Sequence, residues 1–157
     1  MKGLLIHLAL ALLWTALGDP SLGRFLVGLV LTFATLMALR RVFGVDAYVR
    51  RVLGFLRFLF VFAREFLKSN LTVARTVLFE SRETLYPDFI TYDLSGLRTG
   101  EILLLSHCIT LTPGTTSVEV SDDGQTLVIH ALDARDPDAV RQGIDTTLRA
   151  AILAFTR

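Results

Sequence analysis

Two uncharged hydrophobic runs occupy the N-terminal part of the chain. Gly3–Leu17 reads GLLIHLALALLWTAL and Phe25–Leu39 reads FLVGLVLTFATLMAL, and a short loop of turn-forming residues separates them. Helical flanking residues extend each run to about 18 residues, at the short end of what crosses a bilayer. The pattern predicts a transmembrane helical hairpin over residues 1–41, with helices at about 3–18 and 22–39.

A cleaved signal peptide is the alternative interpretation of the first run. Lys2, the apolar run behind it and the small residues Ala16 and Gly18 are typical of such a peptide. A second uncharged run follows at once, and this pairing favours a hairpin that stays in the membrane.

Arginines are concentrated on one side of the predicted hairpin. The hairpin loop offers only Asp19, with Arg24 at its edge. Four arginines follow the second run: Arg40, Arg41, Arg50 and Arg51. Cytoplasmic loops carry an excess of Lys and Arg, so this side is predicted to be cytoplasmic. Lys2 places the N-terminus on the same side.

A regular series of cations marks the third segment, residues 42–85. Its members are spaced by 7, 7, 4, 7 and 7 positions: Arg50, Arg57, Arg64, Lys68, Arg75 and Arg82. At about 100° per residue they stay within about 20° of one line along a helix. The opposite side is apolar apart from Asn70: Phe55, Leu59, Phe62, Phe66, Val73 and Val77. The spacing predicts a basic amphipathic helix.

Three placements of this helix are compatible with its pattern. It can lie in the cytoplasmic membrane interface, with aromatic side chains among acyl chains and cations among lipid phosphates. As a third span over about Val52–Leu67, it would place Arg57 in the hydrocarbon at a cost of roughly 2.5–3.5 kcal/mol and send the C-terminal domain outside. Its cations can also contact an acidic partner. The insertion cost favours the interfacial helix.

Alternating apolar and polar residues behind Tyr86-Pro87 predict a small water-facing domain over residues 86–157. The run SDDG is a hairpin signal, and Asp136-Pro137 supplies a helix start. We expect a strand at 88–94, a helix at 99–110, strands at 115–120 and 125–132, and a last helix from Pro137. The predicted fold class is a membrane helical hairpin, an amphipathic interfacial helix and a two-layer α/β domain of β-α-β-β-α order.

Charge divides the chain into a basic and an acidic part, although the whole carries only +1. Residues 1–87 contain eleven Lys/Arg and five Asp/Glu, whereas residues 88–157 contain five and ten. A basic part beside the membrane suits anionic lipid. Nucleic-acid binding is not expected, because the cations sit among Phe and Leu rather than on a polar domain.

No arrangement of residues indicates an enzyme, a metal site or a cofactor. Cys108 is the single cysteine, which excludes an internal disulfide and a multi-cysteine metal site, and we expect it to be buried. The adjacent His107 lacks a second pair of ligands. An enzyme built around His130 and Asp133 is the weakest hypothesis, because no motif supplies a nucleophile or a glycine-rich phosphate loop.

Within the two predicted spans, His7 is the only residue among Asp, Glu, Lys and His. Ion and proton transporters place Asp, Glu, Lys or His in their spans, because an ion in hydrocarbon needs polar groups that offset its lost hydration. We expect His7 near the cytoplasmic end, as a polar contact between helices. This chain alone is therefore predicted to transport nothing.

One stretch of the predicted domain resembles a known family. The run ITLTPGTTSVEV from Ile109, the run TLVIHALD to Asp133 and then Asp136-Pro137 resemble the E subunit of Mrp-type multisubunit Na⁺/H⁺ antiporters. The paired spans, the arginine-rich helix and the small C-terminal domain are similar to that family along essentially the whole chain. The LTPGT element is the most specific part. We interpret its residues as a structural turn that ends a helix and enters a strand: Thr112, Pro113, Gly114 and Thr115.

The resemblance implies membership of a six- or seven-subunit cation/proton antiporter of a bacterial plasma membrane, whose large subunits carry the proton-handling groups. The expected function is an accessory, non-conducting subunit that supports assembly and stability. Other subunits and membrane lipid are the expected partners, reached through the six cations of the third segment. No cofactor, nucleic acid or small-molecule substrate is expected on this chain. The alternative is a stand-alone sensor of anionic lipid surfaces.

Overall fold

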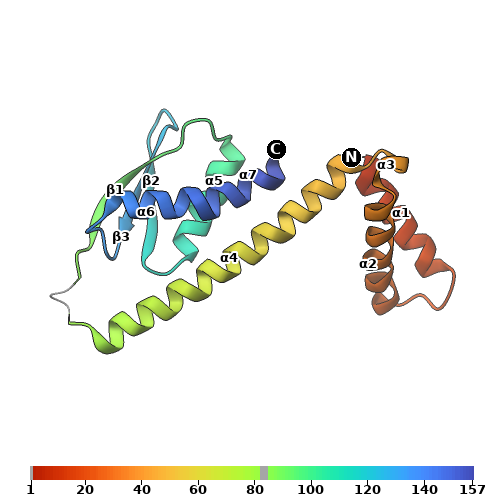
Figure 1. The fold of residues 1–157 in the computed structure, drawn as a ribbon, viewed down its shortest axis with the longest axis horizontal. Helices are drawn as coiled ribbons and strands as arrows, with labels where there is room; N and C mark the ends of the chain where they lie inside the picture. Colours follow the sequence, from red (N-terminus) through yellow and green to blue (C-terminus); the bar gives the residue numbers. More distant parts are fainter. Residues whose placement is uncertain (1, 82–84) are drawn as a thin grey trace. The chain divides into compact units, whose positions relative to one another are not determined.

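The computed structural model describes residues 2–81 and 85–157, and the predicted contact residue Arg82 lies outside them. The chain divides into two compact units, one ending at Leu53 and the other beginning at Gly54 (Figure 1). Each unit has its own hydrophobic core. They are therefore described separately.

The first unit is helical. Its elements are α1 (Lys2–Ala16), α2 (Leu22–Ala38), α3 (Arg40–Phe43) and the first turns of α4 (Asp46–Phe79). Ser21 begins α2, because its side-chain oxygen accepts the Arg24 amide at 3.2 Å. Among the described residues, no helix combines the length and the apolar character that a membrane span requires.

Small residues let α1 and α2 approach each other closely. A side chain at Gly28 would place its first carbon 2.8 Å from the Trp14 ring and 3.2 Å from the Ala11 carbonyl oxygen. Gly3 is equally constrained, since a side chain there would collide with Tyr48. The core of this unit is completed by three buried residues from α2, the link before α4 and the start of α4: Leu36, Val45 and Val49.

The second unit contains a three-stranded antiparallel sheet. Its strands are β1 (Asp88–Asp93), β2 (Thr115–Val120) and β3 (Thr126–Ala131), in the order β1-β3-β2. Ile90 pairs with Ile129 across the centre of the sheet. The register of β2 shifts between Ser117 and Glu119, which leaves Val118 as an extra residue.

Helices cover one face of this sheet, because only alternate residues of β1 and β3 are buried. The covering helices are α5 (Thr99–Leu111) and a C-terminal helix made of α6 (Pro137–Ile144), a π-helical turn (Asp145–Arg149) and α7 (Ala150–Thr156). The element order is β-α-β-β-α, as predicted from the sequence. The largest fully buried side chains of this unit come from both layers: Leu94, Leu105, Ile109, Leu127, Ile129 and Ile152.

One side of α4 packs against this domain. The Phe58 side chain is 6% exposed, and its ring centroid lies 5.3 Å from that of Phe155 in α7. A side chain at Gly54 would place its first carbon 2.8 Å from the Ala154 carbonyl oxygen, so glycine permits this close approach. Phe62 joins the same contact, although its position opposite the cations suggested acyl chains as its surroundings. Periodicity identifies an apolar side but not what covers it.

Arginine side chains occupy part of the free edge of β1. Arg141 donates from Nε to the Thr91 carbonyl oxygen at 2.8 Å. Arg149 donates to the carbonyl oxygens of Asp93 at 3.1 Å and Ser95 at 2.8 Å. A strand edge with unpaired backbone groups is a template for pairing with another strand, and these bonds remove some of those groups.

A buried carboxylate joins the start of α5 to the end of α7. Glu101 is 3% exposed and accepts hydrogen bonds from Arg157 at 2.9 Å, the Thr156 hydroxyl at 2.7 Å and the Arg98 amide at 2.8 Å. The Arg157 hydrogen bond is the main reason that the pKa of Glu101 falls to about 2, since burial acts in the opposite direction. Such a group stabilises the fold only while it is ionised.

We expect Glu101→Gln to lower the free energy of unfolding at neutral pH. The carboxyl pKa rises from about 2 in the folded chain to its ordinary 4.5 on unfolding. The contribution is therefore complete above the unfolded value and is lost as the pH falls through the folded one. Denaturant titrations of the full chain in detergent should show a gap between wild type and variant that closes in acid. Glu119→Gln, an exposed carboxyl on β2, is the control and should show no gap. A gap of constant size down to about pH 2 would contradict this role.

Candidate interaction surface and cavity

The cations predicted to align on α4 are exposed wherever the structure describes them: Arg50, Arg57, Arg64, Lys68 and Arg75. Arg64 and Lys68 lie 4.0 Å from Glu65, at the outer limit of an ion pair. Arg57 and Arg75 have no ion pair within residues 2–81 and 85–157. These charges are available to an anionic surface outside the chain.

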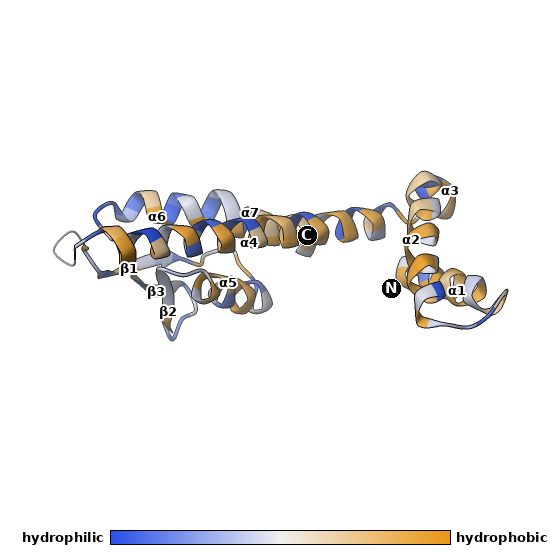
Figure 2. Cartoon of the chain, turned by 90° about the horizontal axis from the view of Figure 1, so that it is seen from below, coloured by the Kyte–Doolittle hydropathy of each residue, from blue (hydrophilic) through white to orange (hydrophobic). Residues whose placement is uncertain are grey.

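A second apolar side of α4 is left uncovered. Seven large side chains on it are 43% to 75% exposed: Leu56, Leu59, Phe60, Leu67, Leu71, Val77 and Leu78. At about 100° per residue they lie opposite Gly54 and Phe58, which face the domain. Figure 2 shows the resulting hydrophobic stretches along α4. An exposed apolar surface of this extent indicates contact with another protein or a membrane.

The sequence contains the pattern of this second apolar side, but this side was not distinguished from the apolar side opposite the cations. The series Leu56, Phe60, Leu67 and Leu71 has helical spacing, yet only the side opposite the cations was assigned as apolar. A helix that is apolar on two sides touches something on both, and the α/β domain accounts for one of them.

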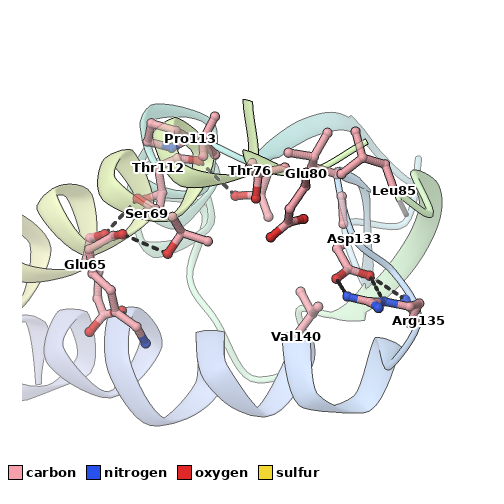
Figure 3. Close-up of a pocket in the computed structure, with 17 residues that line it drawn as sticks. Glu65, Ser69, Thr76, Glu80, Leu85, Thr112, Pro113, Asp133, Arg135 and Val140 are labelled. Atoms are coloured by element: carbon pink, nitrogen blue, oxygen red, sulfur yellow. Dashed lines mark hydrogen bonds and ion pairs between the residues drawn. The ribbon is translucent and has the colours of Figure 1, made fainter. Parts of the chain in front are cut away.

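A cavity of about 460 Å³ lies between α4 and the α/β domain (Figure 3). Seven of the residues that line it come from α4 and its C-terminal end: Glu65, Lys68, Ser69, Thr72, Val73, Thr76 and Glu80. The facing wall is formed by the Thr112–Thr115 turn, the end of β3 and the start of α6. A cavity of this volume is in the range of small-molecule and side-chain binding sites.

The predicted turn motif forms part of this wall. Pro113 and Gly114 lie between α5 and β2, and Gly114 has φ +94°, a left-handed conformation that side chains disfavour. The Thr115 hydroxyl donates to the Ile109 carbonyl oxygen at 2.9 Å. The Leu132 amide donates to the Gly114 carbonyl oxygen at 2.8 Å. The turn therefore connects the end of α5 to the end of β3 at the rim of the cavity.

The carboxylates at the cavity differ in their pairing. Asp133 accepts hydrogen bonds from Arg135 at 2.8 Å and 2.5 Å, and these bonds hold the pKa of Asp133 below its ordinary value. The Arg135 guanidinium also lies 5.5 Å from the Tyr86 ring centroid. Glu80 points into the cavity (Figure 3) and forms no ion pair with any residue that the structure describes. Asp133 is thus bound by Arg135, whereas Glu80 acts on Arg135 only through its charge.

The histidines of the second unit lie apart from this cavity. The His130 ring packs against Phe89 at 5.2 Å, while Asp133, its candidate partner, is bound by Arg135. His107 is exposed and its Nδ1 bonds to the backbone of its own helix. In the described part of the chain, no group of three His, Cys, Asp or Glu residues can hold a metal ion.

His7 joins three helices of the first unit. It is 8% exposed, its Nδ1 lies 2.5 Å from the Tyr48 hydroxyl, and its Nε2 lies 2.8 Å from the Leu29 carbonyl oxygen. A carbonyl oxygen only accepts, so Nε2 carries the proton and Nδ1 accepts from Tyr48. The Phe33 ring packs beside the imidazole at 5.8 Å. Both nitrogens are used within the protein, as expected of a polar contact between helices.

Sequence reasoning missed a polar group in the core of the second unit. The Tyr92 hydroxyl donates to Asp145 at 2.5 Å. The Arg149 guanidinium donates to the Tyr92 hydroxyl oxygen at 3.4 Å. Burial, followed by the Asp145 hydrogen bond, raises the pKa of Tyr92 to about 12. Asp145 and Arg149 are spaced as an ordinary helical ion pair, so only the position of β1 reveals their partner. The group attaches the C-terminal helix to the sheet.

Comparison with known proteins relates both units to one family. Residues 7–155 match the model of a family described as Na⁺/H⁺ ion antiporter subunit. Two proteins named as the E subunit of a Na⁺/H⁺ antiporter, from Alkalihalophilus pseudofirmus and Bacillus subtilis, are each 30% identical over 155 residues. Each alignment covers 98% of this chain and 98% of the relative.

Two solved structures contain similar chains. One, in the structure of the Mrp complex from Dietzia sp. DQ12-45-1b, is 25% identical with a TM-score of 0.51, over 64% of this chain and 93% of that chain. The other belongs to the membrane-bound sulfane sulfur reductase, an archaeal respiratory membrane complex. It is 22% identical with a TM-score of 0.57, over 96% of this chain and 98% of that chain, and this second likeness concerns the fold alone.

We expect His7→Ala to lower the amount of folded protein. The substitution leaves the Tyr48 hydroxyl and the Leu29 carbonyl without their partner, and a buried group without a hydrogen bond costs about 1–3 kcal/mol. Tyr48→Phe removes one bond only and should have a smaller effect. His7→Gln restores one donor and one acceptor and should recover part of the loss. Thermal unfolding and the steady-state level in membranes measure all three. Equal stability of His7→Ala and wild type would show that the network is dispensable.

Proposed function

This chain belongs to the family of Na⁺/H⁺ ion antiporter subunits, and we propose that it is an accessory, non-conducting subunit that supports the assembly and stability of a monovalent cation/proton antiporter complex. One observation supports this most: α4 presents an uncovered apolar side beside unpaired cations, a surface suited to contact rather than chemistry. The similarity to a chain of an Mrp complex supports a place among other subunits.

The non-conducting role is supported by the state of His7. It is the only ionisable side chain within the two hydrophobic runs, and both of its ring nitrogens are bound to groups of the same unit. An ion crossing a low-dielectric region needs polar groups that are free to replace its water. His7 offers no free nitrogen, and its titratable neighbour Tyr48 is itself bound to one of the two ring nitrogens.

We propose that α1 and α2 form a hairpin in a bacterial plasma membrane. They have 15 and 17 residues, so surrounding subunits or a locally thinned bilayer would have to accommodate them. The four arginines behind α2 favour a cytoplasmic location for the rest of the chain.

We further propose that α4 lies in the cytoplasmic interface rather than across the bilayer. The side from Gly54 through Phe58 and Phe62 packs on the α/β domain, whose residues 88–157 contain ten Asp/Glu and five Lys/Arg. A spanning helix would carry this domain contact into the hydrocarbon, where polar groups are costly. In the interface, the uncovered apolar side can meet acyl chains or a neighbouring subunit while the cations meet lipid phosphates.

A stand-alone sensor of anionic lipid is the second candidate, because the same cations and apolar side suit a lipid surface. The two functions differ in what accompanies the chain after solubilisation. A subunit tagged in its native host and extracted in mild detergent should migrate as a large particle with further membrane proteins, identified by mass spectrometry. A small particle containing this chain alone would favour the sensor.

We expect joint reversal of Arg57, Arg64 and Arg75 to glutamate to reduce the amount of intact complex several-fold. Each cation near an anionic surface contributes about 1 kcal/mol, so one reversal is tolerated while three are not. The matched control replaces the same three residues with lysine, which keeps the charge and should preserve assembly. The yield of co-purified subunits and antiport per assembled complex are the measurements. Normal assembly with lost antiport would overturn the accessory role.

We expect a cysteine at Asp122, exposed in the β2–β3 turn, to resist an impermeant thiol reagent in intact cells and to react after permeabilisation. A cysteine at Asp19, in the α1–α2 loop, should react in intact cells. The native Cys108 gives no background, because it is 4% exposed and burial raises its thiol pKa to about 11. Labelling at position 122 in intact cells would place the α/β domain outside.

A further inference from the structure

We propose that the cavity between α4 and the α/β domain binds alkylammonium groups, supplied by lysine side chains of a neighbouring subunit. The cavity contains the most specific sequence motif of the chain, Thr112–Thr115, which the accessory role does not itself explain. That the ligand is a lysine of a neighbouring subunit rests on the proposed function, since such a subunit must be present. That the cavity binds an alkylammonium group does not depend on that function.

Four hydroxyl groups of the lining present acceptors rather than donors to a ligand. On α4, Ser69 donates to the Glu65 carbonyl oxygen at 2.8 Å and Thr72 donates to the Lys68 carbonyl oxygen at 3.0 Å. On the facing wall, the Thr112 hydroxyl donates to the Cys108 carbonyl oxygen at 2.7 Å, and Thr115 is engaged in the same way. Each of these four hydroxyls has used its one proton, so each offers only lone pairs to a ligand. A ligand that binds to them must donate hydrogen bonds.

The charges of the lining favour a cation. Glu80 points into the cavity and has no ion pair among the described residues. The Glu65 side chain is 17% exposed, and its nearest cations, Arg64 and Lys68, are 4.0 Å away. Both carboxylates are therefore left with most of their acceptor capacity. A donor that enters the cavity gains charge-assisted hydrogen bonds, which are stronger than neutral ones.

Anions and bare metal ions fit the cavity poorly. The Arg135 guanidinium is the one cation set in the facing wall, as far as the structure describes it, and Asp133 already binds it through two nitrogens. The other cation of the lining, Lys68, lies 4.0 Å from Glu65. An anion would therefore meet Glu65 and Glu80 beside cations that already face carboxylates. No cluster of three metal-binding side chains exists in the described parts of the chain, so a compact metal ion lacks a ligand set.

Lysine fits better than arginine because the acceptors are spread over two walls. An ammonium group is a compact charge with three donors, whereas guanidinium prefers a planar pair of acceptors. Glu65 and Glu80 lie about 22 Å apart along α4, so separate side chains of an extended segment would reach them. Apolar residues between the carboxylates are suited to the methylene stems of those side chains: Val73, Pro113, Leu132 and Val140.

The test uses zero-length carbodiimide coupling, which joins a carboxylate to an amine in direct contact. The tagged chain carries Lys68→Arg, which keeps the charge and removes the one lysine beside the cavity. The complex is purified from native membranes, coupled and mapped by mass spectrometry. We expect an amide between Glu80 or Glu65 and a lysine of a co-purified subunit. Glu80→Gln and Glu65→Gln should each abolish the linkage at their own position, whereas the exposed Glu119→Gln should leave both unchanged.

Spermidine distinguishes a free amine from a lysine of a partner. If no linkage to a partner forms but spermidine raises the Tm of the purified wild-type chain and not of Glu80→Gln, the alkylammonium site stands and the partner lysine is wrong. If neither occurs, the cavity does not bind this chemistry. A chain that purifies without other subunits would instead contradict the proposed function, and spermidine would still test the cavity.

Discussion

The close contact between α4 and the last helix is the constraint on which the arrangement of the second unit depends. At Gly54 the two backbones approach so closely that a methyl group would meet the Ala154 carbonyl oxygen at 2.8 Å. Around that point Phe55, Phe58 and Phe155 interlock, with ring centroids 5.3 Å to 6.2 Å apart. Aromatic packing of this kind supplies apolar burial and fixed geometry together. This contact determines which side of α4 is buried against the α/β domain of the same chain.

Everything else on α4 follows from that assignment. With one side committed to the α/β domain, the other apolar side and the line of cations remain for surroundings outside the chain. Farther along the same helix the contact opens, and the packed aromatic residues give way to Ser69, Thr72 and Thr76 at the cavity. A single helix thereby packs against the α/β domain, presents a contact surface and forms one side of a polar cavity, and Lys68 belongs to both of the last two.

Local signals in the sequence predicted most elements of the fold, whereas contacts between distant segments could not be predicted. The proline and glycine of the LTPGT element and the Asp136-Pro137 start fix element ends through backbone geometry alone, and α5 and α6 end and begin beside them. The cavity depends on α4 meeting residues some 40 positions later, and the Tyr92–Asp145 bond joins residues 53 apart. Periodicity carries no information about such pairings, which is also why two apolar sides of α4 were interpreted as one.

The arginines along β1 affect how newly made copies of the chain can pair with each other before other subunits bind. Arg141 and Arg149 hold the outward carbonyls of β1, and on the other edge the Ser117 amide of β2 donates to the Thr110 hydroxyl of α5. Two waiting copies therefore offer each other few free backbone groups with which to extend a sheet. Copies that have not yet met other subunits are therefore less able to pair through these sheet edges than copies with open edges would be.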